Sequence, residues 1–168
     1  LYREEFLIKR EQMLAELYKN VPSGVGHGGE FRLSDKELDG VLNKGVKWAL
    51  EKGYAKKEDI EHTEDEGCMR GADASKVSQR AKARGRNQLG TIGAGNHFLE
   101  IQEVETIFDK NVADIFNLKE DQIVVMIHTG SRGLGHQTCS DYIQKMEKQF
   151  GFSHLPDREL ACAPIESP

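Results

Sequence analysis

The stretch QLGTIGAGNHFLEIQ, residues 88–102, combines a glycine-rich segment, a histidine and an alternating apolar run. Glycine allows positive φ angles and lets a ligand approach the backbone closely. The glycines are Gly90, Gly93 and Gly95, and Asn96 and His97 follow them. The apolar residues that come next (Phe98, Leu99, Ile101 and Val104) predict a strand. We therefore expect His97 beside a glycine turn, at the start of a strand.

A second stretch, HTGSRGLGHQ, residues 128–137, contains the same features in the opposite order. The apolar run IVVMI, residues 123–127, leads into His128, and its β-branched content predicts a buried strand over residues 124–128. The glycines that follow, Gly130, Gly133 and Gly135, predict a turn. Two histidines at strand ends, with Asn96, Ser131 and Arg132 nearby, favour one shared functional site. The alternative is a pair of core histidines in tight turns.

Both stretches resemble the central motifs of the RtcB family, the GTP- and manganese-dependent RNA-splicing ligases. Other segments stand in that family's order: VPSGVG at residues 21–26, Lys76-Val77-Ser78 with Arg80-Ala81-Lys82, and DRELACA at residues 157–163. The resemblance covers essentially the whole chain, and two long motifs in the right order make it specific.

The resemblance implies a metal site and a nucleotide site. His97 and His128 match family residues that each hold one ion of a manganese pair, bridged by the cysteine of an Asp-x-x-Cys pair. The residues that match the nucleotide-facing stretch are Asn96, His97, Phe98, Leu99 and Glu100. Arg132 matches a residue that holds RNA phosphate.

The family reaction joins an RNA 3'-phosphate or 2',3'-cyclic phosphate end to a 5'-hydroxyl end. GTP first transfers GMP to a histidine, and the GMP then activates the RNA 3'-phosphate. The resemblance thus implies GTP and two Mn²⁺ ions as cofactors. It implies RNA (tRNA exon halves or broken RNA) and an archease-like activating protein as partners.

The chain corresponds to a central portion of such a ligase. In the family, the Asp-x-x-Cys segment precedes this portion, and the third metal histidine and the guanylylated histidine follow it. We therefore expect no catalytic residue within the chain, and we expect the chain alone to be inactive. Two alternatives stay open: a non-catalytic module that binds a metal or a phosphate, and a family member tuned to RNA repair instead of tRNA splicing.

Asp65-Glu66-Gly67-Cys68 also has an Asp-x-x-Cys spacing, but it lies well downstream of the VPSGVG segment. In the family the metal-binding pair lies upstream of that segment. Short motifs match often by chance. We interpret this pair as a coincidence.

The length and composition fit one soluble globular domain. The chain has 168 residues, of which 38% are hydrophobic and 30% charged, and the apolar runs are far too short to span a membrane. Cys68, Cys139 and Cys162 are odd in number and show no pattern, which favours a reducing cytoplasm.

The net charge of -5 argues against a protein that coats nucleic acid. The charges are unevenly distributed, however. Six of the nine residues at positions 58–66 are acidic, whereas six cations against one acid occupy residues 70–86. The basic run leads into the first glycine stretch, so Arg84 and Arg86 are candidate phosphate contacts, because the guanidinium fork matches phosphate geometry.

Helical spacing of apolar residues predicts helices over residues 4–18, 34–53 and 134–150. We also expect a short, charged helical turn over residues 56–62, one or two short helices over residues 106–119, and a helix that Asp73 or Ser75 caps and that extends to about Arg84. Ser34 and Glu37 have the spacing of a capping box. We expect an α+β fold in which helices flank a mixed sheet. His27 and His154 are expected in solvated loops, and His136 is expected near the site.

Overall fold

The computed structural model describes residues 1–24, 26, 28–29, 31–151 and 153–167, so the predicted loop residue His27 lies outside the described residues. The class is α+β, as predicted. The chain divides into two compact units, and each unit is built from two chain segments. Unit 1 comprises Leu1–Glu30 and Leu89–Gly130, and unit 2 comprises Phe31–Gln88 and Ser131–Pro168. The single domain expected from the length stays a prediction.

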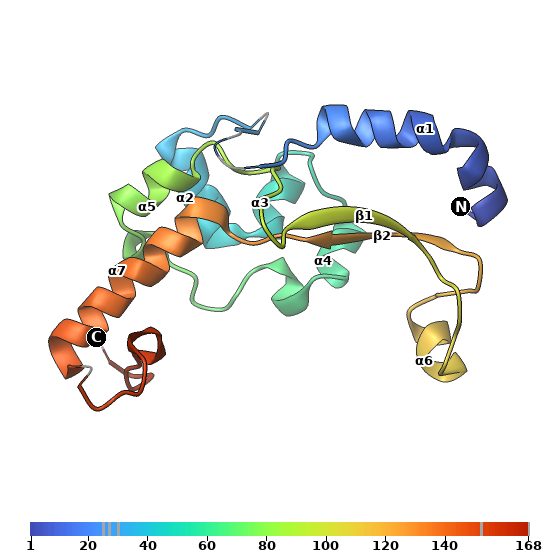
Figure 1. Cartoon of the computed structure of the whole chain (residues 1–168). Helices are drawn as coiled ribbons and strands as arrows, with labels where there is room; N and C mark the ends of the chain where they lie inside the picture. Colours follow the sequence, from blue (N-terminus) through green and yellow to red (C-terminus); the bar gives the residue numbers. More distant parts are fainter. Residues whose placement is uncertain (25, 27, 30, 152, 168) are drawn as a thin grey trace. The chain divides into compact units, whose positions relative to one another are not determined.

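The centre of unit 1 is an antiparallel pair of strands (Figure 1). Strand β1 (Phe98–Glu103) follows the first glycine stretch, and β2 (Ile123–His128) precedes the second, both as predicted. The register pairs Phe98 with His128 and Glu103 with Ile123. Where a mixed sheet was expected, the described residues form only this antiparallel pair. The connection between the strands contains α6 (Lys110–Ile115), whose first turn is capped by the Asp109 carboxylate.

Strand β2 is exposed, so the prediction of a buried strand was wrong. The exposed fractions of Val125, Met126 and Ile127 are 57%, 48% and 59%. β-Branched residues favour any pleated surface, whether or not another layer covers it. In the described part of unit 1, neither a third strand nor a helix covers these three side chains.

Helix α1 (Arg3–Asn20) is attached to the rest of unit 1 at both of its ends. At its start, an isolated antiparallel bridge joins Tyr2 to Gln122, and the Arg3 guanidinium lies 3.5 Å from the Glu103 carboxylate. Beyond its end, the Ile92 amide donates to the Pro22 carbonyl at 2.9 Å. None of its own residues is fully buried. Its position therefore depends on these terminal contacts more than on a core.

In unit 2, the single helix predicted over residues 34–53 is two helices, α2 (Asp35–Lys44) and α3 (Val46–Glu51). Ser34 and Glu37 form the predicted capping box. The break is at Gly45, which has a φ of 54°, and a Cβ atom there would lie 1.9 Å from the Gly67 carbonyl oxygen. A contact with a residue distant in sequence thus ends the helix, and helical spacing does not reveal such a contact.

Helices α5 (Gln79–Gly85) and α7 (Arg132–Phe150) pack side by side in unit 2 (Figure 1). The start of α5 was predicted too early. Asp73 caps only a short 3-10 turn, η2 (Ala74–Lys76), and the Ser78 hydroxyl accepts a hydrogen bond from the Ala81 amide to cap α5. Two ion pairs join α5 to α2: Lys82 with Asp39, at 2.7 Å, and Arg86 with Asp35.

Helix α7 begins at Arg132, so Gly133 and Gly135 lie inside a helix and not in the predicted turn. Glycine weakens a helix by about 1 kcal/mol relative to alanine. Here the absence of a side chain permits close packing. A Cβ atom on Gly133 would lie 2.9 Å from Gln88 Oε1 and 3.3 Å from Arg84 Cβ. Tertiary packing therefore overrides the local preference.

The remaining elements of unit 2 are short: α4 (Lys57–Glu61), which was predicted, and the 3-10 turns η1 (Glu64–Gly67) and η3 (Arg158–Leu160). Leu33, Leu38, Trp48, Ala74 and Ala81 are its buried apolar residues. Among the described residues, no helix combines the length and the apolar character that a membrane crossing requires.

Candidate functional site

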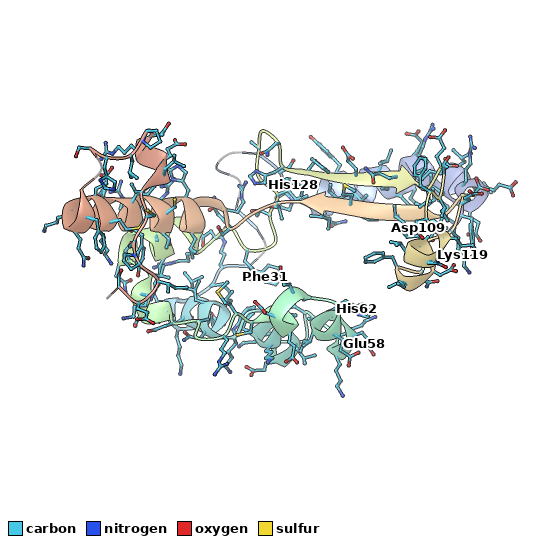
Figure 2. The ribbon with its side chains drawn as sticks, turned by 90° about the horizontal axis from the view of Figure 1, so that it is seen from below. Phe31, Glu58, His62, Asp109, Lys119 and His128 are labelled. Atoms are coloured by element: carbon cyan, nitrogen blue, oxygen red, sulfur yellow. The ribbon has the colours of Figure 1, made fainter. Side chains whose placement is uncertain are left out.

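The structure brings His97 and His128 together at one end of the β1–β2 pair. Their ring centroids lie 6.0 Å apart. The register explains this, because His128 pairs with Phe98, the residue that follows His97. Figure 2 shows His128 at this end of the strands, with Asp109 and Lys119 near α6 at the other end. The expectation that the two rings lie within several ångströms of each other is confirmed.

The glycine loop before β1 orients the His97 ring. Its Nδ1 lies 3.0 Å from the backbone carbonyl of Ala94. A carbonyl oxygen only accepts hydrogen bonds, so Nδ1 carries the proton in the neutral ring and Nε2 keeps its lone pair. A backbone acceptor on the other ring nitrogen is how proteins commonly orient histidine ligands. His97 is therefore prepared to bind a cation through Nε2.

Gly130 leaves space in front of that nitrogen. A Cβ atom on Gly130 would lie 3.6 Å from His97 Nε2. This is ordinary van der Waals contact, so a small side chain would fit beside the ring. His128 itself is exposed, and the Phe98 ring lies 5.5 Å from the His128 ring, centroid to centroid. Both imidazoles are thus accessible to a ligand.

The five residues predicted to face a nucleotide do not share one surface. Asn96 is exposed in the loop, and β1 begins at Phe98. Successive side chains of a strand point to opposite faces, so Leu99 lies on the other face from Phe98 and Glu100. The Glu100 carboxylate accepts a hydrogen bond from Gln102 at 2.8 Å. Their role in nucleotide binding stays a prediction.

The three predicted phosphate contacts, Arg84, Arg86 and Arg132, lie in unit 2. Arg84 donates to the Gln137 side-chain oxygen at 2.9 Å, and Arg86 pairs with Asp35. Arg132 has a φ of 55°, the left-handed region, which is costly for a residue with a side chain. Whether any of the three contacts RNA phosphate stays a prediction.

His136, His154 and the Asp-x-x-Cys motif lie in unit 2. His136 is exposed near the start of α7, and its Nδ1 lies 3.4 Å from Arg84. His154 is exposed, as expected. The Cys68 thiol donates to the backbone carbonyl of Asn43 at 3.3 Å.

The described residues contain no cluster of three or more side chains of the kinds that hold metal ions. Within the described residues, the possible metal ligands that lie together are therefore the two imidazole nitrogens of His97 and His128. Manganese favours mixed oxygen and nitrogen ligands, so these residues fit part of a manganese site.

One feature beside His97 was not predicted. A groove of about 510 Å³ runs between α1 and β1, and it reaches His97 at its rim. Its walls are mainly apolar, and they include Leu14, Leu17 and Tyr18 of α1 with Leu99 and Ile101 of β1. The apolar spacing in α1 indicates which residues form one wall. The sequence does not show which strand forms the opposite wall, because this depends on the contacts that hold α1 beside β1.

Comparisons with known proteins show the family of the chain. The family model described as tRNA-splicing ligase RtcB matches residues 1–168. The chain is 53% identical over 170 residues to the tRNA-splicing ligase RtcB of Methanocaldococcus jannaschii, covering 99% of this chain and 18% of that protein. It is 54% identical over 171 residues to the protein of that name from Aeropyrum pernix, covering 100% of this chain and 35% of that protein. The chain belongs to the RtcB family.

The chain spans only a part of these relatives: 18% of the length of the Methanocaldococcus jannaschii protein and 35% of the length of the Aeropyrum pernix protein. The identity nevertheless extends along the whole chain, as the resemblance of its motifs predicted.

Proposed function

We propose that this chain is part of an RNA ligase that joins RNA 3'-phosphate or 2',3'-cyclic phosphate ends to 5'-hydroxyl ends. In this proposal GTP guanylylates a histidine of the ligase, with release of pyrophosphate. A 2',3'-cyclic phosphate end is first hydrolysed by water to a 3'-phosphate. The GMP then passes to the RNA 3'-phosphate, and the 5'-hydroxyl group attacks that phosphate and releases GMP. The observation that carries the proposal is the pair of imidazoles, 6.0 Å apart, in a chain of the RtcB family.

His97 and His128 are the residues that would hold Mn²⁺ in this proposal. Bound metal ions supply charge stabilisation to phosphoryl oxygens and orient the attacking group. His97 is set for this task by the hydrogen bond from Nδ1 to Ala94, which leaves Nε2 as the ligand. Gly130 lies beside that nitrogen and adds no side chain next to it.

The partial ligand set has a consequence for the chain by itself. Tight manganese binding needs a complete set of deprotonated ligands, and the part of the chain that the structure describes clusters only two imidazoles. We expect the isolated chain to bind Mn²⁺ with a Kd weaker than about 1 μM and to join no RNA. Calorimetric titration measures the first quantity. A submicromolar Kd would contradict the expectation and would point to Asp65 and Cys68 as additional ligands.

The proposal is tested in a protein that carries this chain within the full length of its relatives. His97→Ala and His128→Ala should each lower Mn²⁺-dependent guanylylation by more than about 100-fold, since loss of an outer-shell partner alone costs about 10- to 100-fold. His154→Ala is the matched control, because His154 is an exposed histidine outside the imidazole pair.

Guanylylation is followed with radiolabelled GTP, and ligation with RNA halves that carry a 3'-phosphate and a 5'-hydroxyl. Loss of both activities in the two histidine variants, with the control unchanged, supports the proposal. Full activity in either variant would overturn the metal assignment. A wild-type protein that neither accepts GMP nor joins RNA would favour the alternative, a non-catalytic binding module.

A further inference from the structure

A second hollow, separate from the histidine pair, lies within unit 2 between α7 and the segment η2–α5. Its volume is about 410 Å³. Lys145 and Lys148, which are three residues apart on α7, form one wall of the hollow. Residues with this spacing lie on the same face of a helix. Lys76 and Arg80 face them from the other wall. We call this hollow the basic groove.

The four cations of the basic groove are exposed, and none forms an ion pair with another described residue. Other members of the same basic run are engaged inside unit 2. Lys82 is buried against Asp39, Arg86 pairs with Asp35, and Arg84 donates to Gln137. Apart from Arg70, the cations of the run therefore separate into three that hold elements of unit 2 together and two, Lys76 and Arg80, that face the groove.

One carboxylate, Asp141, also lines the basic groove, but the protein already satisfies its oxygens. The Ser78 hydroxyl donates to Oδ2 at 2.5 Å, and the Gln137 amide donates to Oδ1 at 2.8 Å. These hydrogen bonds, with smaller contributions from Arg80 and Lys145, hold the pKa of Asp141 below its usual range. Asp141 remains an anion that offsets one of the four cations, which leaves the groove with an excess of positive charge.

The groove has little to offer a nucleotide base. Its aromatic residue is Tyr142, whose hydroxyl donates to the Lys76 carbonyl at 3.0 Å. The Lys145 ammonium lies 4.4 Å from the centre of the Tyr142 ring, so it occupies one face of that ring. Stacking on aromatic rings is how single strands of RNA are gripped by their bases. Cations without an available ring instead favour contact with phosphates, which carry no sequence information.

We propose that the basic groove binds the phosphate backbone of a single RNA strand, without preference for its sequence. This inference rests on the proposed function, because it adds to the proposed ligase a surface in unit 2 that contacts the RNA substrate. Each cation that neutralises a phosphate releases a counterion, so binding at the groove weakens as salt rises.

The test compares two double variants of the full-length protein. Arg80→Gln with Lys148→Gln removes one cation from each wall of the groove. Lys36→Gln with Lys57→Gln removes two exposed lysines of unit 2 that do not line the groove, with the same change in net charge. Circular dichroism melting establishes that both variants fold. If the groove double variant does not fold, the two single variants Arg80→Gln and Lys148→Gln replace it.

Fluorescence anisotropy with a labelled RNA of mixed sequence measures binding. We expect the groove variant to bind roughly 10- to 100-fold more weakly at about 50 mM salt, and its slope of log K against log salt to fall by about 1.4. We expect the wild-type protein to bind a homopolymeric RNA of the same length as tightly as it binds the RNA of mixed sequence. The control variant should bind RNA as the wild-type protein does.

The outcomes separate this inference from the proposed function. If the wild-type protein joins RNA, and both double variants bind and join it equally well, the groove inference fails while the proposed function stands. If polyglutamate or inorganic phosphate displaces RNA from the wild-type protein and not from the groove variant at equal charge concentration, the groove is a general anion surface and the inference also fails. If the wild-type protein neither binds nor joins RNA, both proposals fall.

Discussion

The glycines of the first stretch lie in a loop, whereas two of the three glycines in the second lie inside α7. In the loop, Gly90 and Gly95 have φ angles of 75° and 73°, and a Cβ atom on Gly95 would meet nothing within 4 Å. In the helix, a Cβ atom on Gly133 would press against Gln88 and Arg84. With the same spacing, Gly90 and Gly95 of the first stretch allow positive φ angles, whereas Gly133 of the second stretch allows neighbouring side chains to pack closely against the helix.

The difference extends to Arg132, the first residue of α7. Arg132 has a φ of 55°, although it carries a long side chain. The left-handed region costs such a residue about 1–2 kcal/mol. The loop places glycine at its positive φ angles, but the helix start places an arginine there. The strain at Arg132 therefore needs a compensating interaction of its side chain or of its neighbours.

Arg132→Lys tests that interaction. Among the variants that test the difference between the two glycine stretches, it has the largest expected effect. Lysine keeps the charge and the strained backbone but replaces the bidentate fork with a point charge. In the full-length protein we expect RNA joining to fall by about 10- to 100-fold, while the melting temperature and self-guanylylation stay nearly unchanged. A parallel loss of stability and of both reaction steps would show that Arg132 braces the helix start, and would end the assignment to RNA phosphate.

Gly133→Ala tests the role of glycine inside α7. In an exposed helix this change would stabilise the protein by about 1 kcal/mol, because alanine is the better helix former. Here the Cβ contacts with Gln88 Oε1 and Arg84 Cβ should reverse the sign, and we expect a net loss of about 1–2 kcal/mol. Urea denaturation measures it. A stabilised variant would show that α5 and α7 have room to separate.

Gly95→Ala tests the role of glycine in the loop. No atom would clash with the new methyl group, so the expected loss of about 1 kcal/mol comes only from the positive φ angle. Gly95→Asn serves as the control, since asparagine tolerates this region better and should lose less. Equal losses in the two variants would indicate that a contact, and not the backbone angle, requires glycine.

The smallest effect concerns pH. Hydrogen bonds from Ser78 and Gln137 hold the pKa of Asp141 below its usual value of 3.8. A carboxyl group with a lowered pKa in the folded state stabilises the fold above its unfolded pKa, and this contribution disappears as the pH falls through the folded value. The melting temperatures of the wild-type protein and Asp141→Asn should therefore differ above about pH 4 and converge below it. A constant difference down to about pH 2 would contradict this.

Local signals predicted the elements well, because each depends on neighbouring residues. The capping box at Ser34, the strand after His97 and the helix predicted over residues 4–18 all follow from nearby side chains and backbone chemistry. Pairing of the two strands then places His97 beside His128, which the sequence predicted from their positions at strand ends.

The failures of prediction depend on contacts between distant residues. The break at Gly45 comes from Gly67, and the helical glycines of α7 come from the approach of α5. The exposure of β2 depends on whether other elements pack against the strand, and the residue composition of the strand does not reveal this. The partners of Lys82 and Arg86 lie on α2, more than forty residues away, so the basic run could not be divided in advance into structural and groove-facing cations.

The interleaving of the two units has a consequence for synthesis of the chain on the ribosome. Unit 1 needs residues 89–130 to complete itself, so α1 emerges long before its partner strands. At about 5–20 residues per second, the intervening residues 31–88 take roughly 3–12 s to make. Throughout that interval the groove-facing leucines of α1 have no strand to cover them. Neither unit can complete its contacts until the second of its two segments has been synthesised.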